Sequence, residues 1–204
     1  TFTLQYPSFL FPGKTQYATG AAPEKLSIVR KLNSINPFNW LKVGREIRRA
    51  HPDMVMIRFW LPFLAPCLGT VARIVRKDKS IKVVALLDNV IPHEPHFFDA
   101  PLTKYFLKGS DGSITLCEAV SKDLLELKSD AVYTVIQHPL YSHFGQKMDR
   151  SEAERILNLE PGKKNLLFFG LIRTYKGLDI FNLGCTTGGI QNMANCNLTG
   201  HLLQ

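Results

Sequence analysis

The sequence lacks the features that mark several large classes of protein. It has no apolar run of about eighteen residues, so no membrane-spanning helix is expected, and Thr1 opens no positively charged secretory leader. No G-x-G-x-x-G follows a predicted strand, which disfavours a nucleotide-sugar epimerase or dehydrogenase. No zinc-finger spacing, RRM-type aromatic strand or recognition-helix pattern is present either. Binding to nucleic acid is therefore not expected.

Cysteine is scarce, and its spacing forms no pattern. Cys67, Cys117, Cys185 and Cys196 are scattered and contain no C-x-x-C pair. We interpret them as buried or free thiols in a reducing cytoplasm, because this spacing argues against a disulfide framework or a zinc site. The expected compartment is the cytoplasm.

What the sequence does have is a globular composition with an uneven charge. Of its 204 residues, 45% are hydrophobic and 21% are charged, which is enough for a sizeable core. The net charge of +8 comes from the first part of the chain, because residues 1–83 hold fourteen Lys and Arg against four Asp and Glu. A basic half suits nucleic acid, anionic lipid or phosphorylated substrates.

Short apolar strands alternate with helical segments along most of the chain. This alternation predicts an α/β fold, a Rossmann-like parallel sheet with helices on both faces. Strands are predicted at residues 1–5, 26–30, 54–59, 82–87, 112–116 and 131–136. Helices are predicted at residues 36–49, 62–76 and 118–127. In the first of these helices, Asn36 supplies the cap and Pro37 the first turn.

A short charged segment divides the chain. Arg150 opens a brief helix with Ser151 as its expected cap, and Pro161-Gly162 turns the chain into a new strand. After that strand, helical periodicity weakens and Gly, Asn and Thr accumulate. The predicted organisation is a domain at 1–145, a linker at 146–163, the start of a second domain at 164–180 and an atypical tail at 181–204.

The second domain is predicted to open with a phosphate site. A predicted apolar strand ends at Gly170, and it is followed by Arg173, Lys176 and Gly177. A sugar diphosphate requires these parts, since a strand fixes position, glycine lets the backbone approach, and two cations neutralise phosphate oxygens. A solvated basic turn after a buried strand is the alternative. The position of the motif after a linker favours the phosphate site.

Residues 165–179, N-L-L-F-F-G-L-I-R-T-Y-K-G-L-D, resemble the opening of the C-terminal domain in GT-B glycosyltransferases of family four. The strands and helices before them resemble the N-terminal domain of that family more diffusely. The resemblance implies retaining transfer of a hexose from a nucleotide sugar to a glycan or lipid-linked acceptor. It also implies that fixed cations replace a metal and that no cofactor is needed.

The same resemblance implies site residues. Gly170, Arg173, Lys176 and Gly177 are expected to hold the donor diphosphate, and Thr115, at the end of an earlier strand, is expected near the donor. Ser121 is an alternative to Thr115. The family's first strand and most of its second domain have no counterpart in the sequence. The chain is therefore expected to be a fragment that is inactive by itself.

A second polar cluster follows the predicted strand at 82–87. It contains Asp88, Asn89, His93 and Glu94, and ligands of parallel sheets collect at this carboxyl edge. These residues are candidate catalytic or acceptor contacts, and which pair occupies the cleft stays open. The alternatives are an Asx turn at Asp88 and Asn89 and a polar surface loop for the others. A metal site at His93, Glu94 and His96 is not expected, because helical spacing and a further ligand are missing.

Two further alternatives remain. The basic helix at 36–49 and the cluster of Arg73, Arg76, Lys77 and Lys79 suit anionic headgroups, which predicts peripheral contact with an anionic membrane at its inner face. The apolar stripe of that helix is equally explained by packing on the sheet. The alternative to an enzyme is a non-catalytic Rossmann-like binding or regulatory module.

Overall fold

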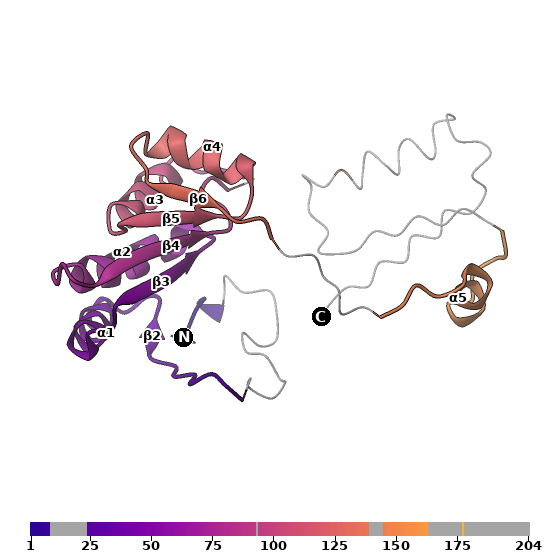
Figure 1. Cartoon of the computed structure of the whole chain (residues 1–204), viewed down its shortest axis with the longest axis horizontal. Helices are drawn as coiled ribbons and strands as arrows, with labels where there is room; N and C mark the ends of the chain where they lie inside the picture. Colours follow the sequence, from indigo (N-terminus) through magenta and orange to yellow (C-terminus); the bar gives the residue numbers. More distant parts are fainter. Residues whose placement is uncertain (9–23, 93, 139–144, 163–176, 178–204) are drawn as a thin grey trace. The chain divides into compact units, whose positions relative to one another are not determined.

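The computed structural model describes residues 1–8, 24–92, 94–138, 145–162 and 177 (Figure 1). The chain divides into two compact units, Thr1–Pro139 and Leu140–Gln204. In the second unit, the described residues contain one short helix, α5 (Arg150–Ile156). All the other helices and strands described below belong to the first unit.

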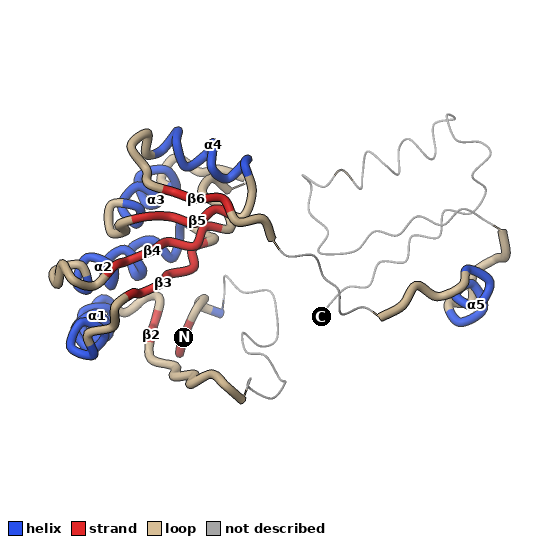
Figure 2. Tube along the Cα trace, viewed as in Figure 1, coloured by secondary structure: helices blue, strands red, loops and turns tan. Residues whose placement is uncertain are grey.

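The first unit is built on a four-stranded parallel sheet (Figure 2). Its strands stand in the order β3, β4, β5, β6. Their bounds are β3 (Met54–Phe59), β4 (Lys82–Leu87), β5 (Gly112–Thr115) and β6 (Tyr133–Val135). A separate parallel pair joins β1 (Phe2–Leu4) to β2 (Leu32–Asn33). The parallel α/β class predicted from the alternation of strands and helices is confirmed.

Helices connect successive strands of the main sheet. They are α2 (Ala65–Val75), preceded by a 3₁₀ turn at Pro62–Leu64, α3 (Asp99–Leu107) and α4 (Glu118–Leu127), while α1 (Pro37–Ala50) precedes β3. Crossovers between parallel strands are right-handed, so strands added in sequential order place their connecting helices over the same face. Among the described residues, no helix is both long and apolar enough to cross a membrane.

One continuous core confirms that arrangement. Alternate residues of β4, namely Val83, Ala85 and Leu87, are fully buried on the face that the helices cover. Phe59 of β3 stacks on Phe106 of α3 with ring centroids 4.4 Å apart. The same cluster includes buried side chains from α2 and α4. Burial of aromatic and branched residues on this one face therefore holds the sheet and its helices together.

The opposite face of the sheet is open along β3. Met54 and Met56 point to it, and they are 55% and 53% exposed. Within the described residues, α2, α3 and α4 share the covered face, and α1 packs against α2. The sequence predicted helices on both faces of the sheet. Within the described residues, helices cover one face only.

Three local predictions need correction. Residues 26–30 form no strand and are exposed, because their apolar side chains find no surface to pack on, and Leu32–Asn33 pairs with β1 instead. Helix α3 was not predicted; its Pro101 lies in the first helical turn, where proline is tolerated. The cap of α5 is Asp149, whose side chain accepts a hydrogen bond from the Ser151 N–H. Ser151 is therefore not the cap.

Candidate functional site

Three neighbouring strands end in the same register at the carboxyl edge of the sheet. Phe59, Leu87 and Thr115 end β3, β4 and β5, and they are partners in the strand register. Residues that follow these ends are therefore brought to one edge, as the sequence reasoning expected for Asp88. Ligands of open parallel sheets bind at this edge.

Asp88 is the best-defined polar group at the edge. Its N–H donates to the Phe59 carbonyl at 3.0 Å, which continues the pairing of β3 with β4 by one residue. Its Oδ2 accepts a hydrogen bond from Arg58 Nε at 2.7 Å, within an ion pair. The Asp88 side chain is only 18% exposed. Its position is therefore fixed by both backbone and side chain.

The other oxygen of Asp88 has no partner. Among the described residues, Asp88 Oδ1 and Ser34 Oγ are the buried side-chain atoms without a hydrogen bond. A carboxylate oxygen in this state costs stability unless a ligand donates to it. The Asx-turn alternative does not describe Asp88, because its side chain pairs with Arg58. Asp88 Oδ1 is thus a buried acceptor without a donor among the described residues.

Arg58 was missed by the sequence reasoning. It occupies the next-to-last position of β3 and points to the open face, like Met54 and Met56. The feature of the sequence that could have identified Arg58 is that it is the one cation in an otherwise apolar strand. Its pairing with Asp88, thirty residues later, depends on the register of β3 with β4, which the sequence does not show.

The loop after β4 contains the other candidates. Asn89 and Glu94 are exposed, and His93 lies outside the described residues. The end of the loop is fixed by Asp99, whose Oδ2 accepts a hydrogen bond from the His96 N–H at 2.8 Å. His96 also stacks on a phenylalanine ring. The structure therefore gives His96 a structural role and brings Asp88, Asn89 and Glu94 to one loop.

Thr115 and Ser121 meet inside the protein. Thr115 is fully buried, and its hydroxyl lies 2.8 Å from the Ser121 hydroxyl. Ser121 donates a further bond to the Cys117 carbonyl. These bonds join the end of β5 to the first turns of α4. Both hydroxyls are thus already paired within the chain, unlike Asp88 Oδ1.

The predicted donor site lies almost wholly beyond the described residues. Gly170, Arg173 and Lys176 are outside them. Gly177 is described, with a φ of 65°, in the left-handed region that favours glycine. Within the described part of the chain, no three His, Cys, Asp or Glu side chains gather as they would around a metal ion.

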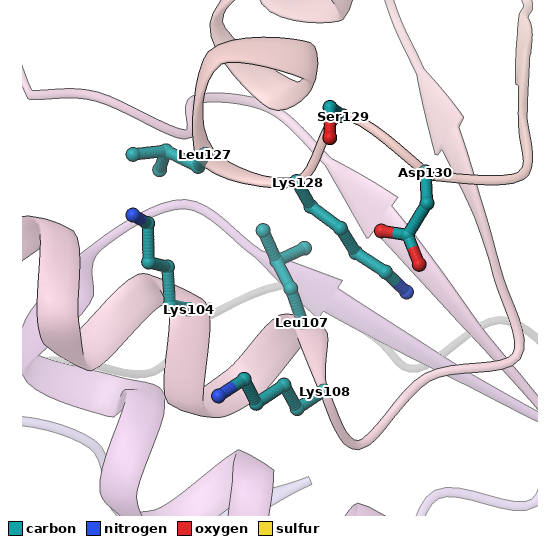
Figure 3. Close-up of a pocket in the computed structure, with 7 residues that line it drawn as sticks. All are labelled: Lys104, Leu107, Lys108, Leu127, Lys128, Ser129 and Asp130. Carbon is teal, nitrogen blue, oxygen red and sulfur yellow. The ribbon is translucent and has the colours of Figure 1, made fainter.

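A shallow cavity of about 280 Å³ lies at the opposite edge of the sheet (Figure 3). It is lined by Lys104, Leu107, Lys108, Leu127, Lys128, Ser129 and Asp130. The three lysines stand at or just beyond the last turns of α3 and α4, where cations balance the negative end of a helix dipole. That role accounts for them without a ligand.

Comparison with known proteins adds no family assignment. A scan against protein-family models found no match, and a search of curated proteins found none either. The function of the chain is therefore inferred from its own residues and from the resemblance of the motif at 165–179.

Proposed function

We propose that the chain is part of a retaining GT-B glycosyltransferase that transfers a hexose from a nucleotide sugar to a glycan or lipid-linked acceptor. The observation that carries this proposal is the Asp88 carboxylate, which is held by Arg58 at the ligand-binding edge of a parallel sheet and keeps one oxygen unpaired. The motif at 165–179 supports the donor side of the proposal, which is binding of the nucleotide sugar. Peripheral contact with an anionic membrane is a separate proposal, because it does not depend on sugar transfer.

On the acceptor side, Asp88 Oδ1 accepts a hydrogen bond from the acceptor hydroxyl and orients it. Arg58 keeps the carboxylate in that position from the neighbouring strand. A hydroxyl held at hydrogen-bond distance by a fixed group needs little further ordering before it attacks. Asn89, His93 and Glu94, in the loop that follows, are proposed as further contacts to the acceptor.

On the donor side, Arg173 and Lys176 hold the diphosphate, and the backbone at Gly170 and Gly177 approaches it. Negative charge develops on the diphosphate as the bond to the sugar breaks. Two fixed cations stabilise that charge in the transition state. In this scheme they take the place that a metal ion occupies in other transferases. Thr115 is left out of the scheme, because its hydroxyl is already paired with the Ser121 hydroxyl.

A non-catalytic Rossmann-like binding or regulatory module is the second candidate. The pairing of Thr115 with Ser121 and of His96 with Asp99 favours it, because these polar groups at the site edge serve structure. Such a module retains a ligand-binding edge and needs no activated hydroxyl.

A thermal-shift titration of the complete protein, of which this chain is proposed to be part, separates the two candidates. A nucleoside diphosphate that binds only the folded protein raises its melting temperature, and the stabilisation grows with the logarithm of the ligand concentration once the site is saturated. The transferase proposal predicts a rise with a nucleoside diphosphate and none with the matching nucleoside, since the phosphates carry the contacts. Equal responses to both ligands, or a response to neither, would favour the module.

A further inference from the structure

The outward side of α1 carries a stripe of cations that begins with a large aromatic ring. Phe38, Lys42, Arg45 and Arg49 follow one another at spacings of four, three and four residues, which places them on one line along the helix. All four are exposed, and Phe38 is 83% exposed. We call these four residues the α1 stripe.

The inward side of α1 is already used for packing. Val43 and Gly44 are buried, and Trp40 and Ile47 pack against the core. Gly44 lies so close to α2 that a Cβ in its place would meet the Ile74 Cβ at 2.9 Å. The α1 stripe therefore lies on the side away from the core, and core packing does not account for Phe38.

The cations of the α1 stripe have no ion-pair partners among the described residues. The one acid of the helix, Glu46, is engaged by Lys31 Nζ at 2.7 Å. That hydrogen bond, together with the nearby positive charges, lowers the pKa of the Glu46 carboxyl. Glu46, the one carboxylate of α1, thus offsets only part of the positive charge of the three cations in the stripe.

Two exposed apolar residues stand at the N-terminal end of α1. Ile35, just before the helix cap, is half exposed, and Phe38 lies in the first turn. A surface for nucleic acid needs cations, but it gains little from an aliphatic side chain in water. A lipid interface binds cations and apolar side chains together, because the cations contact the headgroups and the apolar side chains enter the acyl boundary.

We propose that the α1 stripe binds an anionic lipid surface, with α1 lying flat on the headgroups and with Phe38 and Ile35 inserted. The fourteen residues of α1 present about 21 Å of helix to that surface. The inference is independent of sugar transfer, because vesicle binding requires neither a donor nor an acceptor. Failure of either proposal would leave the other standing.

Co-sedimentation of the full chain with vesicles tests this inference. The chain should bind vesicles of phosphatidylcholine with 30% phosphatidylserine and should not bind phosphatidylcholine alone. The triple variant Lys42→Gln, Arg45→Gln, Arg49→Gln should bind about a hundredfold more weakly, as expected for three cations near the surface. Phe38→Ala should bind about tenfold more weakly, because it removes the inserted ring.

The cavity lysines provide a matched control. The variant Lys104→Gln, Lys108→Gln, Lys128→Gln also removes three positive charges, at the edge shown in Figure 3, and should bind vesicles like the unmodified chain. Circular dichroism checks that each variant is folded. Equal losses in both triple variants, or unchanged binding by Phe38→Ala, would overturn the proposal. So would binding of an RNA oligonucleotide through the α1 stripe without vesicle binding.

Discussion

Arg58 and Asp88 form an ion pair across neighbouring strands, with Arg58 Nε 2.7 Å from Asp88 Oδ2. The pair connects the open face of β3 to the carboxyl edge of β4. Because one carboxylate oxygen is engaged and the other is not, the carboxylate is oriented and still able to accept a hydrogen bond. The acceptor half of the proposed function depends on this arrangement.

A double-mutant cycle measures the strength of that pair. Arg58→Ala, Asp88→Asn and the double variant should give a coupling free energy of about 0.5–1 kcal/mol in urea unfolding. The value is modest because Arg58 is 61% exposed and its charge is screened by water. Strictly additive single effects would show that the pair does not orient Asp88.

Gly44 and Ile74 set how closely α1 approaches α2. Gly44→Ala should lower the free energy of unfolding by about 1–3 kcal/mol, because the added Cβ meets the branched side chain of Ile74. In an Ile74→Ala background the same change should stabilise the protein, since alanine has the higher helix propensity. Urea unfolding of the unmodified chain, the two single variants and the double variant measures these changes in the free energy of unfolding. Destabilisation of equal size in both backgrounds would contradict the contact.

The two described cysteines should differ in reactivity. Cys67 is buried, and burial raises the pKa of its thiol to about 12, whereas Cys117 is exposed. At pH 8 the Cys67 thiol is therefore both protonated and shielded from reagents. Iodoacetamide labelling with peptide mass spectrometry should find Cys117 modified in the folded chain and Cys67 modified only in denaturant. Rapid labelling of Cys67 under native conditions would contradict the packing of α2.

Helix α5 should depend on pH through its cap. Hydrogen bonds from the Ser151 side chain and backbone lower the pKa of Asp149, so the ionised cap is the stabilising form. Because the folded pKa lies below the ordinary value, this contribution is present above the unfolded pKa and is lost as pH falls through the folded pKa. The protection factors of the α5 amides, which correct for the intrinsic pH dependence of exchange, should fall over that acid range.

Two variants separate the cap from its charge. Asp149→Asn keeps a capping oxygen and should remove most of the pH dependence, whereas Asp149→Ala should quicken exchange in α5 at every pH. The same pH dependence in Asp149→Asn as in the unmodified chain would assign it to another group.

Local sequence signals predicted much of the first unit. The bounds of β3, β4 and α4 were predicted as the structure has them, because apolar runs and polar breaks coincide there. Asn36 caps α1 as predicted, through a hydrogen bond to its side chain from the Asn39 N–H. Patterns that act over a few residues were sufficient for these elements.

Long-range packing could not be predicted in the same way. The Arg58 and Asp88 pair depends on strand register, and the burial of Thr115 depends on how α4 packs on β5. Residues 26–30 have the composition of a strand, but they lie exposed, and the segment that pairs with β1 is Leu32–Asn33. The donor motif at 165–179 stays a prediction, since only Gly177 of it is described.

Calorimetric titration of the complete transferase, of which this chain is proposed to be part, with uridine, guanosine and adenosine diphosphates tests the central claim most directly. At least one of them should bind, and the Arg173→Ala, Lys176→Ala variant should bind it at least about a hundredfold more weakly, because two charge-assisted contacts to phosphate are lost. Asp88→Asn should bind it like the unmodified chain, since Asp88 acts on the acceptor. Unchanged affinity in the Arg173 and Lys176 variant, or binding of no diphosphate, would contradict the transferase assignment.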